Sequence, residues 1–387
     1  MRRLLGTPLS LAPATILLLA GTVVALPGAA TTAPAEPRPT RVRLSAPAGE
    51  VVRSATVALA DRSWSTARST ARGDARTVTL RTDRFSMVGA TWRGPHPRVE
   101  LRTLHADGWT TWQHADPMAD GPAASSGRGA SDLLWVDDST AIQVRAHGGL
   151  PGSLAVVLID PGHLPSDRTA SPAAARPLPG RAARPTAAPP PRLRTREDWD
   201  ANPRWRNGEP HYMHRLKQVH IHHTATGNGY TRAEVPGILR GMYRYHTKTL
   251  GWFDIGYNFL VDRFGRAWEG RSGGVDRLVR GAHTLGFNER SVGIAVIGNL
   301  DERRPSARAL STVIKLAAWK LDRYGRVATG RVSVRSTGSD KYAQDERVRL
   351  PVVDGHRDTN DTACPGEFLY AKLPEIRRRT QWRINHW

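Results

Sequence analysis

The sequence predicts two folded domains of different class: an all-β, sandwich-like domain over residues 37–163, and an α/β domain over residues 194–387 in which helices flank a mixed central β-sheet. Three observations support this division. The chain has 387 residues, which is long for one compact domain. Apolar and polar residues alternate in the first range, whereas strand-like and helix-like patterns follow one another in the second. Residues 164–193, rich in Pro, Ala and Arg and without periodicity, predict an extended linker.

The N-terminal segment predicts export. Arg2 and Arg3 precede an apolar run from about Ile16 to Leu26, and small residues follow it. This is the pattern of a secretory signal peptide, which we place at residues 1–30. The apolar run is shorter than the roughly 20 residues that a spanning helix needs, so we expect no stable membrane anchor. We therefore expect a secreted protein.

The all-β domain carries no catalytic constellation. Runs such as "VVRSATVALAD" and "TAIQVRAHG" alternate apolar with polar residues, and Gly, Pro and Asp separate these runs at short intervals. Its tryptophans could form a carbohydrate-stacking surface, but such residues more often fill a sandwich core, which is the role we expect. They are Trp64, Trp92, Trp109, Trp112 and Trp135.

The α/β domain begins with a strand in "QVHIHHTAT". A T-x-x-E capping box, Thr231 to Glu234, opens the first helix, which we expect to end near Gly251. "YNFLVDRFGRAWEG" predicts a hairpin, "SVGIAVIGNL" a buried strand, and residues 306–324 an amphipathic helix. "RLPVVDGHRD" predicts a further strand, and a short helix follows Pro365. Strands and helices in this order predict a mixed sheet with helices packed on it.

The charge balance favours anionic partners. The chain has 56 basic and 35 acidic residues, a net charge of +21. Such a surface attracts nucleic acid, anionic cell-wall polymers or acidic membranes. The sequence contains no helix-turn-helix, zinc-finger or RNP-like motif, and an exported protein does not meet intracellular nucleic acid. We therefore expect no nucleic-acid partner and retain anionic cell-wall polymers as a candidate.

The segment "VHIHHTAT" contains three histidines. On a strand, His220 and His222 point to one face and His223 to the other. A His-x-His pair on one face can bind zinc. A histidine on a half-buried strand can equally be a hydrogen-bonded neighbour of the core, so the segment alone leaves both interpretations open.

A second segment, "DGHRDTNDTACPG", supplies further metal-ligand types. It contains His356 and Cys364, the only cysteine of the chain. A catalytic zinc site usually has three protein ligands and leaves a fourth position for water. One histidine of the first segment together with this pair would complete such a set. A metal would also hold the lone thiol of an exported protein as a thiolate and protect it from oxidation.

Four blocks together carry a resemblance to a known family. "VHIHHTAT", "GWFDIGYNFLVDRFGRAWEGR", "GAHTLGFNERSVGIAVIGNL" and "GHRDTNDTACPG" occur in this order. They resemble the peptidoglycan recognition protein family and its zinc-dependent N-acetylmuramoyl-L-alanine amidases. The resemblance covers residues 194–387, about half of the chain. The first half is similar, much more weakly, to the β-rich accessory region of actinobacterial members, and the lack of a disulfide near the first helix fits a bacterial origin.

The resemblance implies the roles of individual residues. His222, His356 and Cys364 would hold Zn²⁺. The implied catalytic residues are Tyr257 and Thr362, whose hydroxyls would hydrogen-bond the developing oxyanion or relay a proton. The substrate-binding candidates are His283, Arg271 and Trp252. Where family members usually have an apolar residue, this chain has His220, which is a candidate for a contact behind the metal ligands or for a substrate-facing group.

The function implied is that of a secreted, cell-wall-associated zinc amidase that hydrolyses the bond between the lactyl group of N-acetylmuramic acid and L-alanine in peptidoglycan. The main alternative is a non-catalytic recognition protein that binds muropeptides. Such members lose a metal ligand, commonly the cysteine, and Cys364 is present here. A third hypothesis is a basic protein that holds anionic wall polymers around a structural zinc. That site would need a fourth protein ligand, for which His220 is the obvious candidate.

Overall fold

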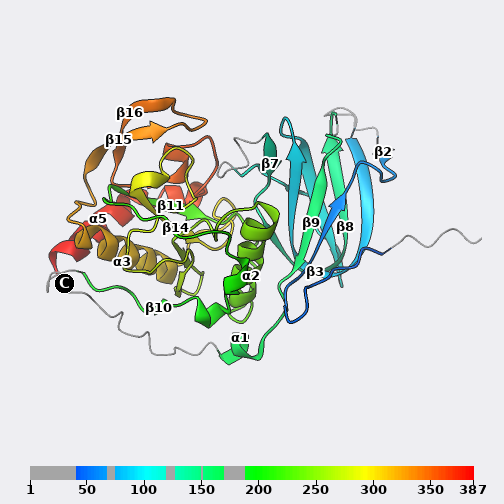
Figure 1. The fold of residues 1–387 in the computed structure, drawn as a ribbon, viewed down its shortest axis with the longest axis horizontal. Helices are drawn as coiled ribbons and strands as arrows, with labels where there is room; N and C mark the ends of the chain where they lie inside the picture. The colour runs from blue at the N-terminus through cyan, green and yellow to red at the C-terminus, as the bar shows by residue number, and fades with distance from the viewer. Residues whose placement is uncertain (1–40, 68–74, 119–126, 150, 170–187) are drawn as a thin grey trace, which may run out of the picture. The chain divides into compact units, whose positions relative to one another are not determined.

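The computed structural model describes residues 41–67, 75–118, 127–149, 151–169 and 188–387 (Figure 1). The predicted signal peptide lies outside these residues. None of the helices in this described part is long and apolar enough to cross a membrane.

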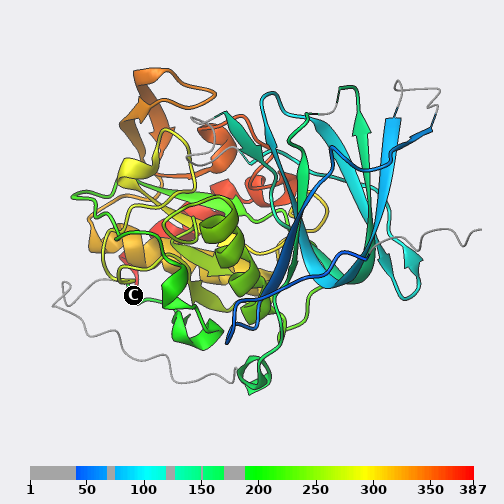
Figure 2. The ribbon, with the colours of Figure 1, turned by 45° about the vertical axis from the view of Figure 1, so that its right-hand side comes forward.

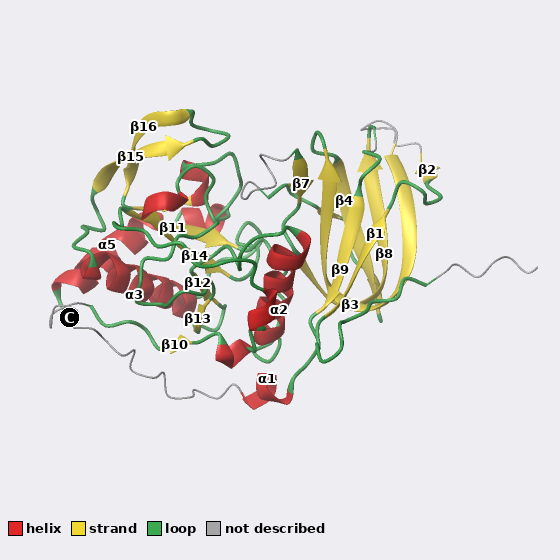
Figure 3. Cartoon of the chain, in the orientation of Figure 1, coloured by secondary structure: helices red, strands yellow, loops and turns green. Residues whose placement is uncertain are grey.

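The N-terminal half is all-β, as predicted (Figure 3). Its strands are β1 (Arg53–Ala58), β2 (Ser65–Ala67), β3 (Ala75–Arg93), β4 (Arg98–His105), β5 (Gly108–Trp109), β6 (Gln113–His114), β7 (Arg128–Ala130), β8 (Leu134–His147) and β9 (Ala155–Asp160). They pair antiparallel in the order β1-β9-β3-β8-β4-β5, with β2 and β7 on β3 and β6 on β4. The long strands β3 and β8 contribute to two apolar clusters, one inside this domain and one shared with the next. We call this half the β-sandwich.

The tryptophans of the β-sandwich divide between core and surface. Trp92 is buried in the core of the β-sandwich, as predicted, whereas Trp135 is buried in the cluster shared with the α/β half. Trp109 is 37% exposed, so the prediction is wrong for this residue. The half-buried Trp112 packs under two guanidinium groups, with Arg145 at 4.1 Å and Arg102 at 4.7 Å from its ring centroid.

The C-terminal half has the predicted mixed sheet with helices (Figure 1). Its strands are β10 (Leu193–Arg194), β11 (Gln218–His223), β12 (Phe259–Val261), β13 (Ala267–Glu269), β14 (Ser291–Val296), β15 (Arg331–Thr337), β16 (Gln344–Pro351) and β17 (Val353–Gly355). Its α-helices are α2 (Val235–Arg244), α3 (Ala307–Arg323), α4 (Glu367–Tyr370) and α5 (Leu373–Asn385). Shorter turns are η2 (Glu197–Trp199), η3 (Pro203–Trp205), η4 (Tyr245–Thr249), η5 (Asn288–Arg290) and η6 (His356–Asp358). The sheet order is β10-β13-β12-β14-β11-β17, parallel except for the β12–β13 hairpin.

The inner strand β11, between β14 and the edge strand β17, is buried on both faces. Val219 and Ile221 belong to the apolar core under α3, together with residues of β12 and β14. The alternate residues, His220 and His222, therefore point to the opposite face, where α2 packs. The strand thus places His220 and His222 on one face, and both side chains are fully buried.

Most predicted elements are present, with three differences. Of the two hydrogen bonds of the predicted capping box, the one seen is that from the Thr231 N–H to the Glu234 carboxylate, at 2.5 Å. The helix α2 continues as the wider turn η4 before Gly251. The antiparallel pair β15–β16, drawn in orange, is a separate two-stranded sheet that we did not predict (Figure 2).

The start of the predicted linker is folded. Residues Pro165–Thr169 form the short helix α1. Asp167 in this helix is buried, and its carboxylate accepts two hydrogen bonds from the guanidinium of Arg240 in α2, at 2.7 and 2.8 Å. A buried, bidentate pair of this kind holds its two elements in one orientation. The prediction of an extended segment therefore fails for these residues.

The β-sandwich and the α/β half share one apolar core. Residues Thr40–Trp387 cluster as a single compact unit. Met87, Trp135 and Ile159 of the β-sandwich pack with buried residues of α2 and the adjoining turns in one cluster. A Cβ atom on Gly241 would lie 2.2 Å from the Met87 sulfur, which shows how closely the two surfaces approach. The β-sandwich is therefore packed against the α/β half and is not an independent domain on a linker.

Candidate metal centre and active-site cavity

Three metal-ligand side chains from distant segments meet at the carboxyl end of β11. His222 lies on β11, His356 opens η6 directly after β17, and Cys364 lies in the following loop. One ligand atom from each lies within 4.8 Å of those of the other two. In the described part of the chain this is the group whose geometry suits a metal ion, and it is the trio predicted from the sequence.

The orientation of the His222 ring is set from both sides. Its Nδ1 atom lies 3.7 Å from the Cys364 sulfur, and its Nε2 atom lies 3.1 Å from Nδ1 of His283. A neutral imidazole has one donor and one acceptor nitrogen. If Nδ1 of His222 is the metal-binding atom, Nε2 carries the ring proton and donates a hydrogen bond to Nδ1 of His283.

Burial shifts the pKa values of the side chains in this cluster. It lowers the pKa of His222 well below the usual range, with the neighbouring His356 as the next cause. Burial also raises the pKa of the Cys364 thiol. Hydrogen bonds with His356 and with the His223 N–H lower this pKa and so offset part of the rise. A buried divalent cation would supply the positive charge that a thiolate needs. Two imidazoles and one thiol form a donor set that suits Zn²⁺ and leaves a fourth position open.

His283 does not lie in a groove, contrary to the role expected for it. It is fully buried behind His222. Two glycines make the space for its ring: a Cβ atom would lie 2.5 Å from ring atoms at Gly293 and 2.3 Å at Gly281. The position of His283 fits a residue that orients a metal ligand.

The other two histidines of the first segment have separate partners. The Nδ1 atom of His220 lies 2.5 Å from Oδ1 of Asp354, and both side chains are fully buried. His220 is therefore neither exposed to substrate nor part of the ligand cluster. It does not supply the fourth protein ligand that a structural zinc would need. On the opposite face, Nδ1 of His223 accepts from the Leu300 N–H at 3.1 Å, a structural contact.

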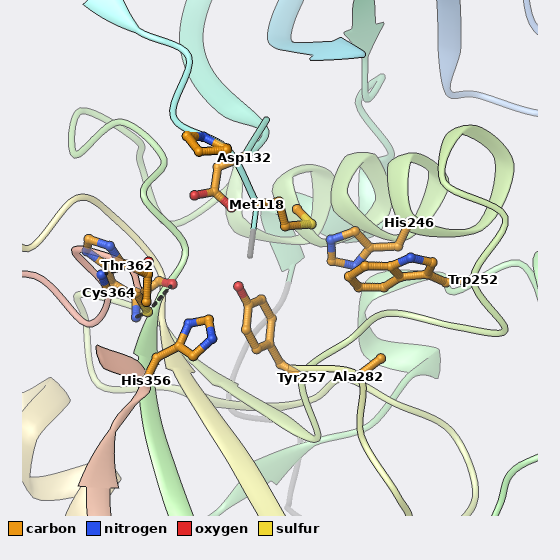
Figure 4. A pocket seen from close by; sticks show the side chains of 11 residues that line it. Met118, Asp132, His246, Trp252, Tyr257, Ala282, His356, Thr362 and Cys364 are labelled. Atoms are coloured by element: carbon orange, nitrogen blue, oxygen red, sulfur yellow. Dashed lines mark hydrogen bonds between the residues drawn. The ribbon is translucent and has the colours of Figure 1, made fainter. Parts of the chain in front are cut away.

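A small cavity opens beside the ligand cluster, with Tyr257 and Thr362 in its wall (Figure 4). Its empty volume is about 370 Å³. The Tyr257 ring centroid lies 5.4 Å from that of His222. The Thr362 oxygen accepts from the Cys364 N–H at 3.2 Å, which fixes the hydroxyl next to the candidate ligand. Tyr257 and Thr362 thus both line the cavity beside the ligand cluster.

The cavity continues into a wider groove. Trp252 and Ala282 line both, and the groove has an empty volume of about 1520 Å³. Arg271 lines the groove, where its guanidinium donates to the Ile255 carbonyl at 3.0 Å. Burial lowers the pKa of Arg271 to about 10. The structure therefore places Arg271 and Trp252 at the groove, and their role in substrate binding stays a prediction.

The cavity wall includes residues that the sequence did not single out for the site. His246 is buried against Trp252, with ring centroids 4.6 Å apart, and its Nδ1 accepts from the Gly256 N–H at 3.2 Å. Met118 and Asp132 come from the β-sandwich (Figure 4). No motif links these two residues to the site, because tertiary packing alone brings them there.

Two family models match the chain. The model described as "N-acetylmuramoyl-L-alanine amidase" matches residues 212–367, which contain the whole ligand trio. The model described as "Rv3811 N-terminal galactose-binding domain-like" matches residues 37–181, the β-sandwich and part of the following segment.

Individual relatives match a little under half of the chain. Peptidoglycan-recognition protein SC1a of Drosophila melanogaster is 31% identical over 179 residues, covering 46% of this chain and 80% of that protein. The human N-acetylmuramoyl-L-alanine amidase is 38% identical over 183 residues, covering 44% of this chain and 27% of that protein. Among solved structures, Drosophila Peptidoglycan Recognition Protein (PGRP)-SA is 31% identical, covering 48% of this chain and 92% of that chain, with a TM-score of 0.37.

Proposed function

Because the chain belongs to the peptidoglycan recognition protein family, we propose that it is a zinc-dependent N-acetylmuramoyl-L-alanine amidase. The bond cleaved would be the amide between the lactyl group of N-acetylmuramic acid and L-alanine of the stem peptide. We further propose that the protein is secreted and acts at the cell wall, with anionic wall polymers as secondary partners of its basic surface.

The observation that carries this proposal is the complete donor set. His222, His356 and Cys364 converge within 4.8 Å, and hydroxyl groups line the cavity beside them. The exposed fractions of His222, His356 and Cys364 are 0%, 4% and 8%, so a cation bound by them would act in a largely water-excluded site. A recognition protein that only binds muropeptides has no need of this combination.

Each residue then has a role that follows from its position. Zn²⁺ bound by the trio would supply an activated water and polarise the scissile carbonyl. The Tyr257 hydroxyl would donate to the oxygen on which negative charge develops. Thr362, whose oxygen already accepts from the Cys364 N–H, has its own O–H proton to donate into the cavity. His283 would keep His222 in the tautomer that serves the cluster.

The main alternative, non-catalytic binding of muropeptides, makes a different prediction for one experiment. A muramyl pentapeptide is incubated with the purified chain, and its products are identified by mass spectrometry. The amidase produces the free pentapeptide with an L-alanine amino terminus, and His356→Ala does not. Binding without any cleavage, in the presence of zinc, would favour the alternative.

A further inference from the structure

The β-sandwich reaches the cavity through one short paired segment. Residues 116–118 lie antiparallel to residues 130–132, joined by a bridge between Pro117 and Ser131. The Met118 N–H donates to the Ala130 carbonyl at 2.8 Å, and the Asp132 N–H donates to the Asp116 carbonyl at 3.1 Å. Pro117, Met118 and Asp132 all line the cavity that contains the ligand cluster. We call this pair the β-sandwich wall.

The wall is fixed to the α/β half at a buried point. Tyr245, the first residue of η4, is fully buried, and its hydroxyl donates to the Ser131 carbonyl at 2.9 Å. On the other side, the Ser131 hydroxyl accepts from the Ala90 N–H at 2.8 Å. The residue after Tyr245 is His246, which lines the same cavity. A hydrogen bond between the two halves, from Tyr245 to Ser131, therefore helps to fix the position of Asp132 at the cavity.

The charges at the two ends of the site differ in sign. The groove beyond Trp252 is lined by two arginines, Arg271 and Arg280, against one acidic residue, Asp340. The wall presents the carboxylate of Asp132 (Figure 4). Stem peptides of peptidoglycan carry free carboxylates, which a cationic groove attracts and an acidic wall repels. An N-acetylated amino sugar is uncharged and offers hydroxyl and amide N–H donors to a carboxylate. Met118 adds an adaptable apolar surface next to that carboxylate.

We propose that the β-sandwich is part of the substrate site, and that Asp132 and Met118 contact the sugar of a muropeptide whose stem peptide lies in the groove beyond Trp252. This proposal rests on the muropeptide-directed function proposed above. It assigns the β-sandwich a specificity role: the substrate is a peptide still attached to its sugar, recognised from both sides of the scissile amide. The free stem peptide is a poor ligand because the wall contributes nothing to its binding.

The test measures binding to the full-length chain after metal removal, so that hydrolysis does not consume the ligand. The probes are a muramyl pentapeptide and the same pentapeptide with an acetyl group on its L-alanine nitrogen in place of the muramyl group, called the free peptide below. The acetyl group avoids a terminal ammonium, which the Asp132 carboxylate would attract. Calorimetry reports both affinities. We expect the wild-type chain to prefer the muramyl form. Asp132→Asn keeps the shape but removes the charge, and should weaken binding of the muramyl form by about tenfold, since a charged hydrogen bond is lost. Met118→Ala should weaken it less, and neither variant should change binding of the free peptide.

Asp138→Asn is the matched control. Asp138 lies on β8, is 57% exposed at its side chain, and pairs with Arg84 at the surface. It does not line the cavity, so its removal should leave both affinities unchanged. Equal loss in all three variants would reveal a general effect on the β-sandwich and would overturn the proposal, as would wild-type affinities in Asp132→Asn and Met118→Ala.

Two further outcomes separate this proposal from the proposed function. If the wild-type chain binds both probes equally and still cleaves the muramyl form when zinc is restored, the wall proposal is wrong and the amidase proposal stands. If the wild-type chain binds neither probe and cleaves nothing, the muropeptide-directed function is contradicted, and the wall proposal with it.

Discussion

His222 and His283 form a histidine pair in which Nε2 of the first lies 3.1 Å from Nδ1 of the second, on the side of the His222 ring away from Cys364. The pair links the candidate metal ligand to a residue that is buried between two glycines. The ligand is therefore held in place by a contact that no substrate can reach.

Replacing His283 should weaken metal binding without removing a ligand. In His283→Leu the His222 N–H loses its acceptor, and we expect zinc affinity to fall by about 10- to 100-fold. His283→Asn offers a side-chain oxygen near the former Nδ1 and should recover part of that loss. Competition with a chromophoric chelator measures both affinities. Equal zinc affinity in His283→Leu and the wild type would contradict the orienting role.

Replacing Cys364 should remove metal binding while preserving the fold. The His223 N–H that donates to the Cys364 sulfur at 3.4 Å can donate equally to a serine oxygen. A serine hydroxyl stays protonated at neutral pH and is a poor zinc ligand. In Cys364→Ser we expect zinc affinity to fall by at least about tenfold and cleavage to be lost, with the thermal midpoint of the metal-free chain little changed. Full activity of this variant would exclude Cys364 as a ligand.

His246 should make the stability of the metal-free chain depend on pH. Burial, with the charge of Arg271 as a second cause, lowers the pKa of His246 from 6.5 to about 3. Below pH 6.5 the unfolded chain binds a proton here that the folded chain does not, so stability is lost as the pH falls from 6.5 towards 3. Well inside that window the loss from this residue is about 1.4 kcal/mol per pH unit.

His246→Gln tests this effect, because glutamine does not titrate and can still accept from the Gly256 N–H. Urea unfolding at pH 5.5 and 4.5 should show a shallower pH dependence in the variant than in the wild type. A constant stability difference between the two proteins at both pH values would show that His246 does not titrate as described.

The shared core predicts that crowding one side of it destabilises the whole compact unit. A Cβ atom on Gly89 in β3 would lie 2.8 Å from the Tyr245 hydroxyl and 2.9 Å from its ring. Gly89→Ala should therefore lower the free energy of unfolding by about 1–3 kcal/mol. Gly149→Ala is the control, since nothing lies within 4 Å of its Cβ position. Calorimetry should show one transition that moves in the first variant only; two independent transitions would contradict a shared core.

The ligand trio was implied by the resemblance that four short sequence blocks carry, whereas the residue pattern alone left open which histidine of "VHIHHTAT" takes part. The sequence also predicted strand β11 and the helix of residues 306–324, because apolar periodicity is a local property. The position of His283 could not be predicted in this way, because it depends on space left by Gly293 on a neighbouring strand. The pairing of His220 with Asp354 has the same origin, since it joins β11 to the adjacent strand β17.

The relation between the two halves was the least predictable feature. A Pro-rich segment indicates a linker, but it does not reveal whether the flanking domains pack on each other. Met87 and Trp135 look like ordinary core residues of a sandwich, yet they pack against helix α2. Asp132 has no motif, and contacts with distant segments, among them the bond from Tyr245 to the adjacent Ser131, place it at the cavity.

The most direct test of the proposed amidase is a zinc titration of the metal-free, full-length chain with a muramyl pentapeptide as substrate. Bound zinc and released pentapeptide are measured at each step. We expect cleavage to be absent without zinc, to rise in proportion to bound zinc, and to reach a plateau at about one zinc per chain. Cleavage at full rate in the metal-free chain, or no cleavage when the site is fully occupied, would contradict the proposal.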